Sequence, residues 1–394
     1  MNKNLNIFIL SVFCVLLFLG CKKHSKQESL FEQAQKIYNN DGWDTFIEYV
    51  NNHGYFAVMD EFEQGATPLL IAVKNGNLEA INFFIEHGAS FFETDENQHD
   101  IIDYLLDNFD RTVADRIINM LPKEYWSNID DFGKTPIVKI ICRCTDFTVI
   151  QRIILSLEYI DIFNTVDIYD ASGKTLLMYA SQFNPDVRVI NFLLDNGANI
   201  NAKNNNEWSS LMYAARYNPN PAVLEYLILR GADMKANSVG LTLTMLASCN
   251  VNSEVLRSVI KFVPEVNDIT KKGKTALMYA CANKQPAAVI KILLEHNADA
   301  NIKDESGKTA LMYALENYTE SEVPYVLLSA GAYSDAADNT GKIPQDYLDA
   351  NPYLKNTDLK KDIKPRQTEL RVPEDNKAPT QETSEQNNDE VSER

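Results

Sequence analysis

The sequence of 394 residues contains 37 lysines and arginines against 55 aspartates and glutamates, so its formal net charge at pH 7 is −18. This acidic balance argues against binding to nucleic acid, whose polyanionic backbone demands a basic surface, and against adhesion to anionic lipid. The hydrophobic fraction of 45% is large enough to build a folded core.

The N-terminal segment Met1–Gly20 stands apart from the rest of the chain. One early cation, Lys3, precedes a run from Leu5 to Leu19 that is almost wholly apolar. A helix needs about 20 apolar residues to span a bilayer, so this run has the length of a signal-peptide core instead. We therefore predict that residues 1–20 are a signal peptide, with an uncleaved signal or a short anchor as the alternative.

The end of this segment resembles the lipobox of bacterial lipoproteins. The stretch "LLFLGC" places the small Gly20 directly before Cys21, and the polar residues 22–28 follow. Phe18 departs from the pattern, because Leu is usual at that position. The resemblance implies that a diacylglyceryl group is added to the Cys21 sulfur, that residues 1–20 are removed, and that the new N-terminus is acylated.

Several acyl chains hold a protein firmly at a membrane. We therefore expect the chain to be lipid-anchored to the bilayer at the cell envelope through Cys21, with residues 21–28 as a tether and no later segment crossing the bilayer. Lys22 stands where an Asp favours inner-membrane retention in many double-membraned bacteria. By this resemblance the expected location is the outer membrane or the periplasmic face, with the cell surface as a further possibility.

An internal repeat organises the sequence after residue 62. The octet "GKTALMYA" occurs twice without change and twice in near-copies, at residues 273–280, 307–314, 173–180 and 207–214. The Thr of this octet, or the residue in its place, marks eight units, at Thr67, Thr135, Thr175, Ser209, Thr242, Thr275, Thr309 and Ile343. From Thr175 onward the markers recur with a period of about 34 residues, which indicates a stack of similar structural units.

Two intervals in this series are longer than one period. The interval from Thr67 to Thr135 is twice the period, so we expect one degenerate unit near residues 97–106. The interval from Thr135 to Thr175 exceeds one period by a few positions, which predicts a longer connection around residues 156–172.

Each unit predicts two short helices. In residues 271–304, Thr275 is a good N-cap for the first helix, and Pro286 suits a turn and the start of the second. Apolar residues spaced i, i+3 and i+4 line one face of each helix, at Leu277, Ala280, Cys281, Ile290, Leu293 and Leu294. Because such helices cannot bury their apolar faces alone, neighbouring units must stack and share one core.

These units resemble ankyrin repeats. Residues 65–90, "GATPLLIAVKNGNLEAINFFIEHGAS", carry the T-P-L signature and the G-A ending of that family almost throughout, and residues 195–215 are similar. The resemblance implies an all-α ankyrin-repeat solenoid of paired antiparallel helices, with about nine repeats including caps. The sequence departs from the family where the usual His is replaced by Met178, Met212, Met278 and Met312, which affects the expected rigidity of those turns but not the fold.

The two ends of the array differ from its middle. Residues 29–62 contain two helical patterns without the T-P-L signature and are predicted to be an N-terminal capping repeat, followed by the ankyrin array at residues 63–354. Residues 355–394 are polar and charged with few apolar side chains, so they are predicted to be a disordered tail. The tail is interpreted as an inert solubilising end, with a partner-binding segment as the alternative.

The recurring GKT is not interpreted as a phosphate loop. That loop needs a Gly five residues before its GK, after a strand, but Ile168, Asp268 and Ile302 stand at those positions. The motif is therefore a turn followed by an N-cap.

No pattern of catalytic or metal-ligating residues is present. Cys142, Cys144, Cys249 and Cys281 follow no metal-ligand spacing and are interpreted as small buried residues without disulfides. His87 and His296 stand at the ends of predicted second helices, where they can bond open carbonyls. The sequence thus predicts a protein that is not an enzyme and has no cofactor, with an enzyme or cofactor carrier hidden in the solenoid as a rival hypothesis.

The resemblance implies that a partner protein binds the concave side of the array, which carries the turns and the exposed ends of the first helices. One turn position holds a row of lysines, Lys134, Lys174, Lys274, Lys308 and Lys342, interrupted by Trp208 and Leu241. Ordinary solvated lysines are the alternative explanation of this row. The helix-end positions include Arg143, Phe183, Arg216 and Tyr217.

Phe183, Trp208, Arg216, Tyr217 and Leu241 are the predicted centre of this surface, with Lys174, Lys274 and Lys308 beside it. Trp, Tyr and Arg are the residue types most enriched among binding hot spots. The alternative is that Trp208 and Phe183 pack against adjacent turns. The repeated Tyr179, Tyr213, Tyr279 and Tyr313 are assigned to packing between repeats instead.

The resulting functional hypothesis is a non-catalytic, lipid-anchored module at the bacterial cell envelope that binds a partner protein on the face around Phe183–Leu241. A surface-exposed or host-directed protein that binds a foreign partner is the alternative.

Overall fold

The computed structural model describes residues 66–127, 130, 134–158 and 170–363, together with 42, 44–49 and 52. The predicted signal peptide, the lipidated Cys21, the tether, most of the capping repeat and residues 364–394 of the tail lie outside the described residues. Within the described part, no helix is both long and apolar enough to cross a bilayer.

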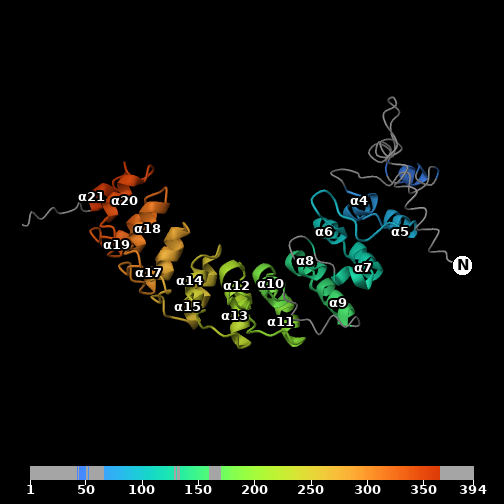
Figure 1. Ribbon diagram of the computed structural model, residues 1–394, viewed down its shortest axis with the longest axis horizontal. Coiled ribbons are helices and arrows are strands. Elements are labelled where there is room, and N and C mark those ends of the chain that lie inside the picture. The colour runs from blue at the N-terminus through green and yellow to red at the C-terminus, as the bar shows by residue number, and fades with distance from the viewer. Residues whose placement is uncertain are drawn as a thin grey trace, which may run out of the picture. The chain divides into compact units, whose positions relative to one another are not determined.

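The regular structure of the described residues is helical and follows the predicted pairing (Figure 1). Nine consecutive helix pairs are present there: α4 (Pro68–Lys74) and α5 (Leu78–Glu86), α6 (Ile101–Asp107) and α7 (Arg111–Met120), α8 (Pro136–Arg143) and α9 (Phe147–Glu158), α10 (Leu176–Phe183) and α11 (Val187–Asp195), α12 (Ser210–Tyr217) and α13 (Pro221–Leu229), α14 (Leu243–Ala247) and α15 (Ser253–Phe262), α16 (Ala276–Ala282) and α17 (Ala287–Glu295), α18 (Ala310–Asn317) and α19 (Glu322–Ser329), and α20 (Pro344–Ala350) and α21 (Leu359–Asp362). A short 3-10 helix, η2 (Lys123–Ser127), follows α7.

The predicted N-caps explain where most of the first helices begin. The Thr175 hydroxyl accepts a hydrogen bond from the Met178 amide at 3.2 Å, and the equivalent bond from Met278 to Thr275 is 3.3 Å long. Thr135 and Thr309 stand at the same position without such a bond. The Pro286 prediction is also confirmed, because α17 begins directly after it.

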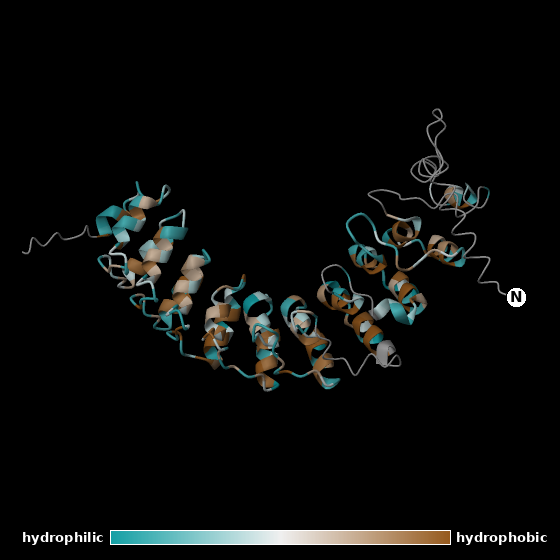
Figure 2. Cartoon of the chain, in the orientation of Figure 1, coloured by the Kyte–Doolittle hydropathy of each residue, from teal (hydrophilic) through white to brown (hydrophobic). Residues whose placement is uncertain are grey.

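The helices are arranged in two compact units, residues 1–271 and 272–394. In the first unit each first helix packs on the first helix of the next repeat, from α4 through α14, and the second helices α7, α9, α11, α13 and α15 form a parallel row. Their shared faces are dry: Leu177, Ala180 and Ile190 have no exposed surface. Hydrophobic residues are concentrated in the helices and hydrophilic ones in the turns between them (Figure 2). This is the all-α solenoid of paired helices that the resemblance to ankyrin repeats implied.

Buried asparagines join neighbouring repeats at the ends of the first helices. The Asn184 side-chain amide donates to the Ile141 and Cys144 carbonyls, at 2.9 and 3.2 Å. Asn218 and Asn250 repeat this pattern on the repeats before them, and Asn351 repeats it in the second unit. These bonds satisfy carbonyls that the end of a helix would otherwise leave open.

The degenerate unit predicted near residues 97–106 is confirmed as α6 and α7. Asp100 caps α6 by accepting bonds from the Ile102 and Asp103 amides, and the Asp103 side chain reaches back to the Asp100 amide. This capping box replaces the Thr signature that the unit lacks.

The end of the folded region lies later than the sequence predicted. Residues 355–363 were assigned to the disordered tail, but they contain α21, which packs on α19. Leu354, Leu359 and Ile363 have no exposed surface. The predicted boundary at residue 355 is therefore too early, because three apolar side chains are enough to fix this segment by tertiary contacts.

The described part of the predicted capping repeat is helical at residues 44–49. Phe46 is 1% exposed, and its ring meets that of Phe84 in α5 at 6.0 Å. Both predicted histidine roles are confirmed: His87 and His296 each contact a carbonyl four residues earlier, at 2.7 and 2.8 Å. The four cysteines in the described part of the chain have free thiols, and three of these residues are buried, whereas Cys142 is half-buried.

Candidate protein-binding surface

In most of the described repeats, the turn before the first helix is held by an acidic or amide side chain. Asp170 accepts hydrogen bonds from the Ser172 and Lys174 amides, both at 2.8 Å, and its second oxygen accepts one from the Tyr179 hydroxyl at 2.7 Å. The same nine-residue spacing links Asp95 to Tyr104, Asn204 to Tyr213, Asp304 to Tyr313 and Asp338 to Tyr347. These five tyrosines therefore tie their first helices to their own turns, a role that the spacing in the sequence could have revealed.

Lys174 is not a solvated turn lysine. Its residue surface is 8% exposed, and its ammonium lies 4.0 Å from the ring centre of Tyr179 and 4.3 Å from that of Tyr213. It donates to the Gln182 side chain and lies 5.4 Å from the Phe183 ring. Burial lowers the pKa of Lys174 to about 8, since no carboxylate is bonded to it. The lysine thus belongs to the floor of the surface.

An aromatic strip, defined as Phe183, Trp208, Tyr213 and Tyr217, runs across α10 and α12. The Trp208 ring lies 5.2 Å from Tyr213 and 6.1 Å from Tyr217. Phe183 and Tyr217 remain 45% and 43% exposed. The predicted alternative, packing of Trp208 against an adjacent turn, is replaced by packing on the tyrosines of its own repeat.

Two further predicted residues flank the strip in the first unit. The Arg216 guanidinium lies 5.1 Å from the Tyr217 ring centre and donates to the Cys249 carbonyl of the next repeat. Leu241 follows at the turn before α14, where it is half-buried and its amide donates to the Asn237 side chain at 3.0 Å. The structure therefore collects Lys174, Arg216 and the strip on consecutive first helices.

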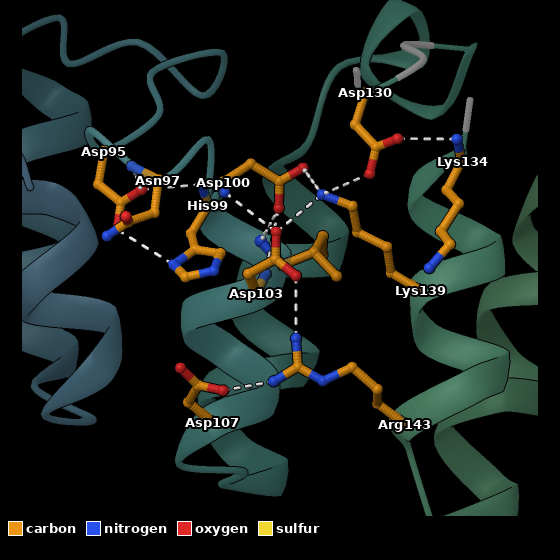
Figure 3. Close-up of polar contacts among 11 residues, drawn as sticks. Asp95, Asn97, His99, Asp100, Asp103, Asp107, Asp130, Lys134, Lys139 and Arg143 are labelled. Atoms are coloured by element: carbon orange, nitrogen blue, oxygen red, sulfur yellow. Dashed lines mark hydrogen bonds and ion pairs between the residues drawn. The ribbon is translucent and has the colours of Figure 1, made fainter. Parts of the chain in front are cut away.

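A charged cluster between α6 and α8 was missed by the sequence analysis. The Lys139 ammonium contacts Asp103 at 2.7 Å, Asp100 at 3.0 Å and Asp130 at 3.5 Å (Figure 3). Lys139 is 7% exposed and stands nine residues after Asp130, where most of the other repeats have tyrosine. Burial lowers the pKa of Lys139, but hydrogen bonds and charge attraction from Asp103 and Asp100 outweigh it and raise that pKa.

Arg143 extends this cluster to the surface. Its guanidinium donates to Asp103 at 2.9 Å and to Asp107 (Figure 3). Burial raises the pKa of Asp103, yet the hydrogen bond from Lys139 and the positive charges of Lys139 and Arg143 hold it below its usual value. The Asp103 carboxylate is therefore ionised and paired.

A cleft of about 410 Å³ connects the charged cluster with the aromatic strip. It is lined by Asn97, Gln98, His99, Asp103, Asp130, Lys134, Lys139, Cys142, Arg143 and Phe183. Phe183 thus belongs both to the strip and to the wall of this cleft, so the two features form one continuous surface of the first unit.

The repeats match known family models along most of the chain. The model "Ankyrin repeats (3 copies)" matches residues 94–204, 140–238, 211–304 and 244–338, and the model "Ankyrin repeat" matches residues 64–96. The chain belongs to the ankyrin-repeat family. Ankyrin repeats form protein–protein interaction modules, so this ankyrin-repeat protein is such a module.

Among solved structures, the chain is similar to the ankyrin-repeat domain of Bcl-3, described as a unique member of the IkappaB protein family. The two are 22% identical with a TM-score of 0.42, over 55% of this chain and 94% of that one. A search of curated proteins gives no match to this ankyrin-repeat chain.

The remaining predicted site residues of the ankyrin-repeat protein lie in the second unit. The Lys274 ammonium is 4.8 Å from the Tyr313 ring centre, and that of Lys308 is 5.1 Å from Tyr347. Lys308 also pairs with Glu316 at 2.9 Å. These lysines therefore pack on the tyrosines of their own unit, and the structure groups them apart from the aromatic strip.

Among the described residues of the ankyrin-repeat protein, no group of three His, Cys, Asp or Glu side chains could hold a metal ion. The carboxylates of the charged cluster are paired with the lysine and arginine of that cluster instead. Its only sequence signal was the replacement of the recurring tyrosine by Lys139, because Asp100 and Asp103 lie 36 to 40 residues before the Lys139 and Arg143 side chains that bind them.

Proposed function

We propose that the protein is a non-catalytic module that binds a partner protein along the aromatic strip and Leu241, on the face of the first unit that carries the turns and first helices. The observation that carries this proposal is the exposure of Phe183 and Tyr217, at 45% and 43%. Truncation of such aromatic side chains at the centre of an interface often costs about 2 kcal/mol or more.

The rigidity of this surface supports the proposal. The turn network of Asp170 and Asn204 fixes Tyr179 and Tyr213, and the Trp208 ring packs on that of Tyr213. A preorganised surface binds more tightly because fewer side chains lose freedom on binding.

The state of the nearest thiol supports a non-catalytic role. Burial raises the pKa of Cys142 to about 11, although Lys134 and Lys174 lie near it. The nucleophilic form of cysteine is the thiolate, so a thiol that stays protonated at neutral pH is a poor nucleophile.

The test is crosslinked affinity capture from native membranes, with the tagged full-length protein as bait. The variant Phe183→Ala, Trp208→Ala, Arg216→Ala, Tyr217→Ala should lose the captured partner while its helical circular-dichroism signal stays unchanged. A matched control changes Tyr333 and Tyr353, which are 61% and 67% exposed in the second unit, to Ala and should retain the partner. Identical captured proteins from all three baits would contradict a binding site on the strip.

The lipid anchor is part of the same proposal. The apolar run at residues 5–19, the lipobox-like "LLFLGC" and the polar residues after Cys21 support acylation of Cys21 at the bacterial cell envelope. Metabolic labelling with an alkyne fatty acid should mark the wild-type protein and not Cys21→Ala. Equal labelling of both would rule out Cys21 as the acylated residue.

The location of the anchored protein separates the two functional alternatives. A protein on the cell surface, directed at a foreign or host partner, should be cleaved when intact cells are treated with protease. A protein on the periplasmic face should be cleaved only after the outer membrane is opened.

A further inference from the structure

The acceptor groups on the floor of the cleft are already engaged. Both carboxylate oxygens of Asp103 are bonded, one to Lys139 and the other to Arg143. Asp130 accepts from the Lys134 amide at 2.8 Å with one oxygen and faces Lys139 at 3.5 Å with the other. A basic ligand entering the cleft would therefore compete with partners that the fold provides.

Donor groups at the rim of the cleft are not engaged in the same way. No hydrogen bond or ion pair within the described part of the chain reaches the Lys134 ammonium, and its side chain runs away from Asp130 (Figure 3). The Arg143 side chain is 40% exposed and uses two of the five N–H groups that a guanidinium carries. His99 contacts Asp95 through Nδ1, and this contact does not use its other ring nitrogen. The His99 side chain is 52% exposed.

A second cation reinforces this excess of donors. Lys174 lies deeper in the surface, and besides burial the positive charge of Lys134 helps to depress its pKa. The positive charges of both lysines also act to lower the pKa of the Cys142 thiol. An anion placed at the rim would relieve their repulsion.

The wall of the cleft adds an apolar requirement. Phe183 lines the cleft and is 45% exposed, and the half-buried Cys142 lines the same cleft. An occupant that fills both features has a carboxylate next to a large apolar group.

We propose that the cleft binds an acidic side chain of an extended partner segment, through Lys134 and Arg143, with a neighbouring large apolar side chain of that segment on Phe183. Charge-assisted hydrogen bonds from Arg and Lys to a carboxylate are among the strongest in proteins. The net charge of −18 does not oppose this, because charges beyond about 8 Å are largely screened at physiological salt. This inference rests on the proposed function and names the chemistry of its partner.

The test is selection of random peptides displayed on phage against the full-length protein. The selected peptides should carry Asp or Glu next to Phe, Tyr, Trp or Leu. Synthetic versions should lose about tenfold to hundredfold in affinity when the acid is replaced by its amide, measured by fluorescence anisotropy.

A double-mutant cycle connects the peptide to the cleft. Lys134→Gln should lower the affinity for the acidic peptide by a similar factor and leave the affinity for the amide peptide unchanged. Lys134→Arg should retain binding of the acidic peptide. Lys274→Gln, at the same turn position in the second unit, is the matched control and should have no effect. Because the described contacts leave the Lys134 ammonium without a partner, its replacement should not disturb folding.

Selected peptides rich in Lys or Arg, or acidic peptides that bind Lys134→Gln as well as wild type, would overturn this inference. Peptides that lose affinity with Trp208→Ala and Tyr217→Ala but not with Lys134→Gln would also overturn it, while leaving the proposed function intact. Peptides that depend on Lys134 but tolerate loss of the strip would support the cleft and contradict the strip.

Discussion

At the residue scale, Lys139 shows how one substitution changes the chemistry of a repeat. Tyrosine at this position binds one acidic side chain of its own turn, as Tyr179 binds Asp170. The flexible lysine, whose ammonium has three N–H donors, reaches Asp130 in its own turn and also Asp100 and Asp103 in the preceding repeat. Tyrosine makes a hydrogen bond within its own repeat, whereas Lys139 makes ionic contacts that also join its repeat to the preceding one.

Loss of the Lys139 charge should destabilise the fold strongly. Lys139→Ala leaves Asp100 and Asp103 buried without their main partner, and removal of one member of a buried pair costs about 3–5 kcal/mol. Urea unfolding followed by circular dichroism would measure this loss. Lys134→Ala, which removes a nearby ammonium that has no partner among the described residues, is the matched control and should change the free energy of unfolding by less than about 0.5 kcal/mol. Equal effects of the two substitutions would contradict the importance of the cluster.

The lowered pKa of Lys174 predicts that the free energy of unfolding rises with pH. Its pKa is about 8 in the folded protein against 10.5 for an ordinary lysine, so the unfolded chain holds more protons between these values. The cost of burying the ammonium is complete below pH 8 and is recovered as the pH rises towards 10.5. The gain is at most about 1.4 kcal/mol per pH unit.

The useful window for this measurement ends near pH 10. Burial and Asp170 raise the pKa of Tyr179 above its ordinary value of 10, so the folded state keeps a proton that the unfolded chain loses, and stability falls again. Between pH 8 and 10 the melting temperature of the wild type should rise relative to Lys174→Met. Parallel curves for the two proteins would contradict the buried state of this lysine.

At the element scale, local signals in the sequence predicted the helix pairs well. Thr175, Thr275 and Pro286 act on the residues next to them, so their effect could be anticipated without the fold. The start of the tail could not be anticipated in this way. Leu359 and Ile363 have a weak local pattern and are fixed by packing of α21 on α19.

The charged cluster illustrates the same limit at the candidate site. Arg143 and Asp103 are 40 residues apart in sequence, and no local pattern links them. The aromatic strip was easier to predict from the sequence, because Trp208 and Tyr217 occupy recurrent positions of one repeat. What the sequence could not show was that Lys174 lies beneath the strip instead of beside it.

The buried asparagines should be strong polar links between repeats. Asn218→Ala removes two hydrogen bonds to the Ser181 and Asn184 carbonyls and leaves both buried, which should cost about 2–3 kcal/mol. Asn283→Ala is the matched control, since its exposed amide bonds to a carbonyl of its own helix at 2.8 Å. It should cost under about 0.5 kcal/mol in the same denaturant titration. A smaller effect at Asn218 than at Asn283 would refute this role.

Close contact between neighbouring turns makes one glycine essential. Gly307 has a φ of +78°, and a methyl group there would lie 2.6 Å from the Asn339 Oδ1 atom and 2.7 Å from its amide nitrogen. Gly331 has a similar φ of +88° with no atom within 4 Å of that position. Gly331→Ala should therefore cost the left-handed strain alone, about 1–2 kcal/mol.

Gly307→Ala adds a steric clash to the same strain and should be clearly more destabilising than Gly331→Ala. Thermal melts of the two variants compare them within one unit. Equal melting temperatures would show that the turns can separate without cost.

At the scale of the whole molecule, stability should be divided between the two compact units. In a stack of repeats, each repeat contacts its sequence neighbours, so a local defect weakens nearby repeats first. The division at residues 271 and 272 therefore predicts that each part responds to damage in its own core before the other does.

Two equivalent core leucines test this division. Leu193 in α11 and Leu293 in α17 are 1% and 0% exposed, and each change to Ala should cost about 2–5 kcal/mol. In hydrogen exchange followed by mass spectrometry, Leu193→Ala should accelerate exchange in peptides before residue 271, and Leu293→Ala in peptides after it. If either substitution accelerated both sets equally, the chain would unfold as one cooperative body, because only global opening exposes amides far from the defect at the same rate.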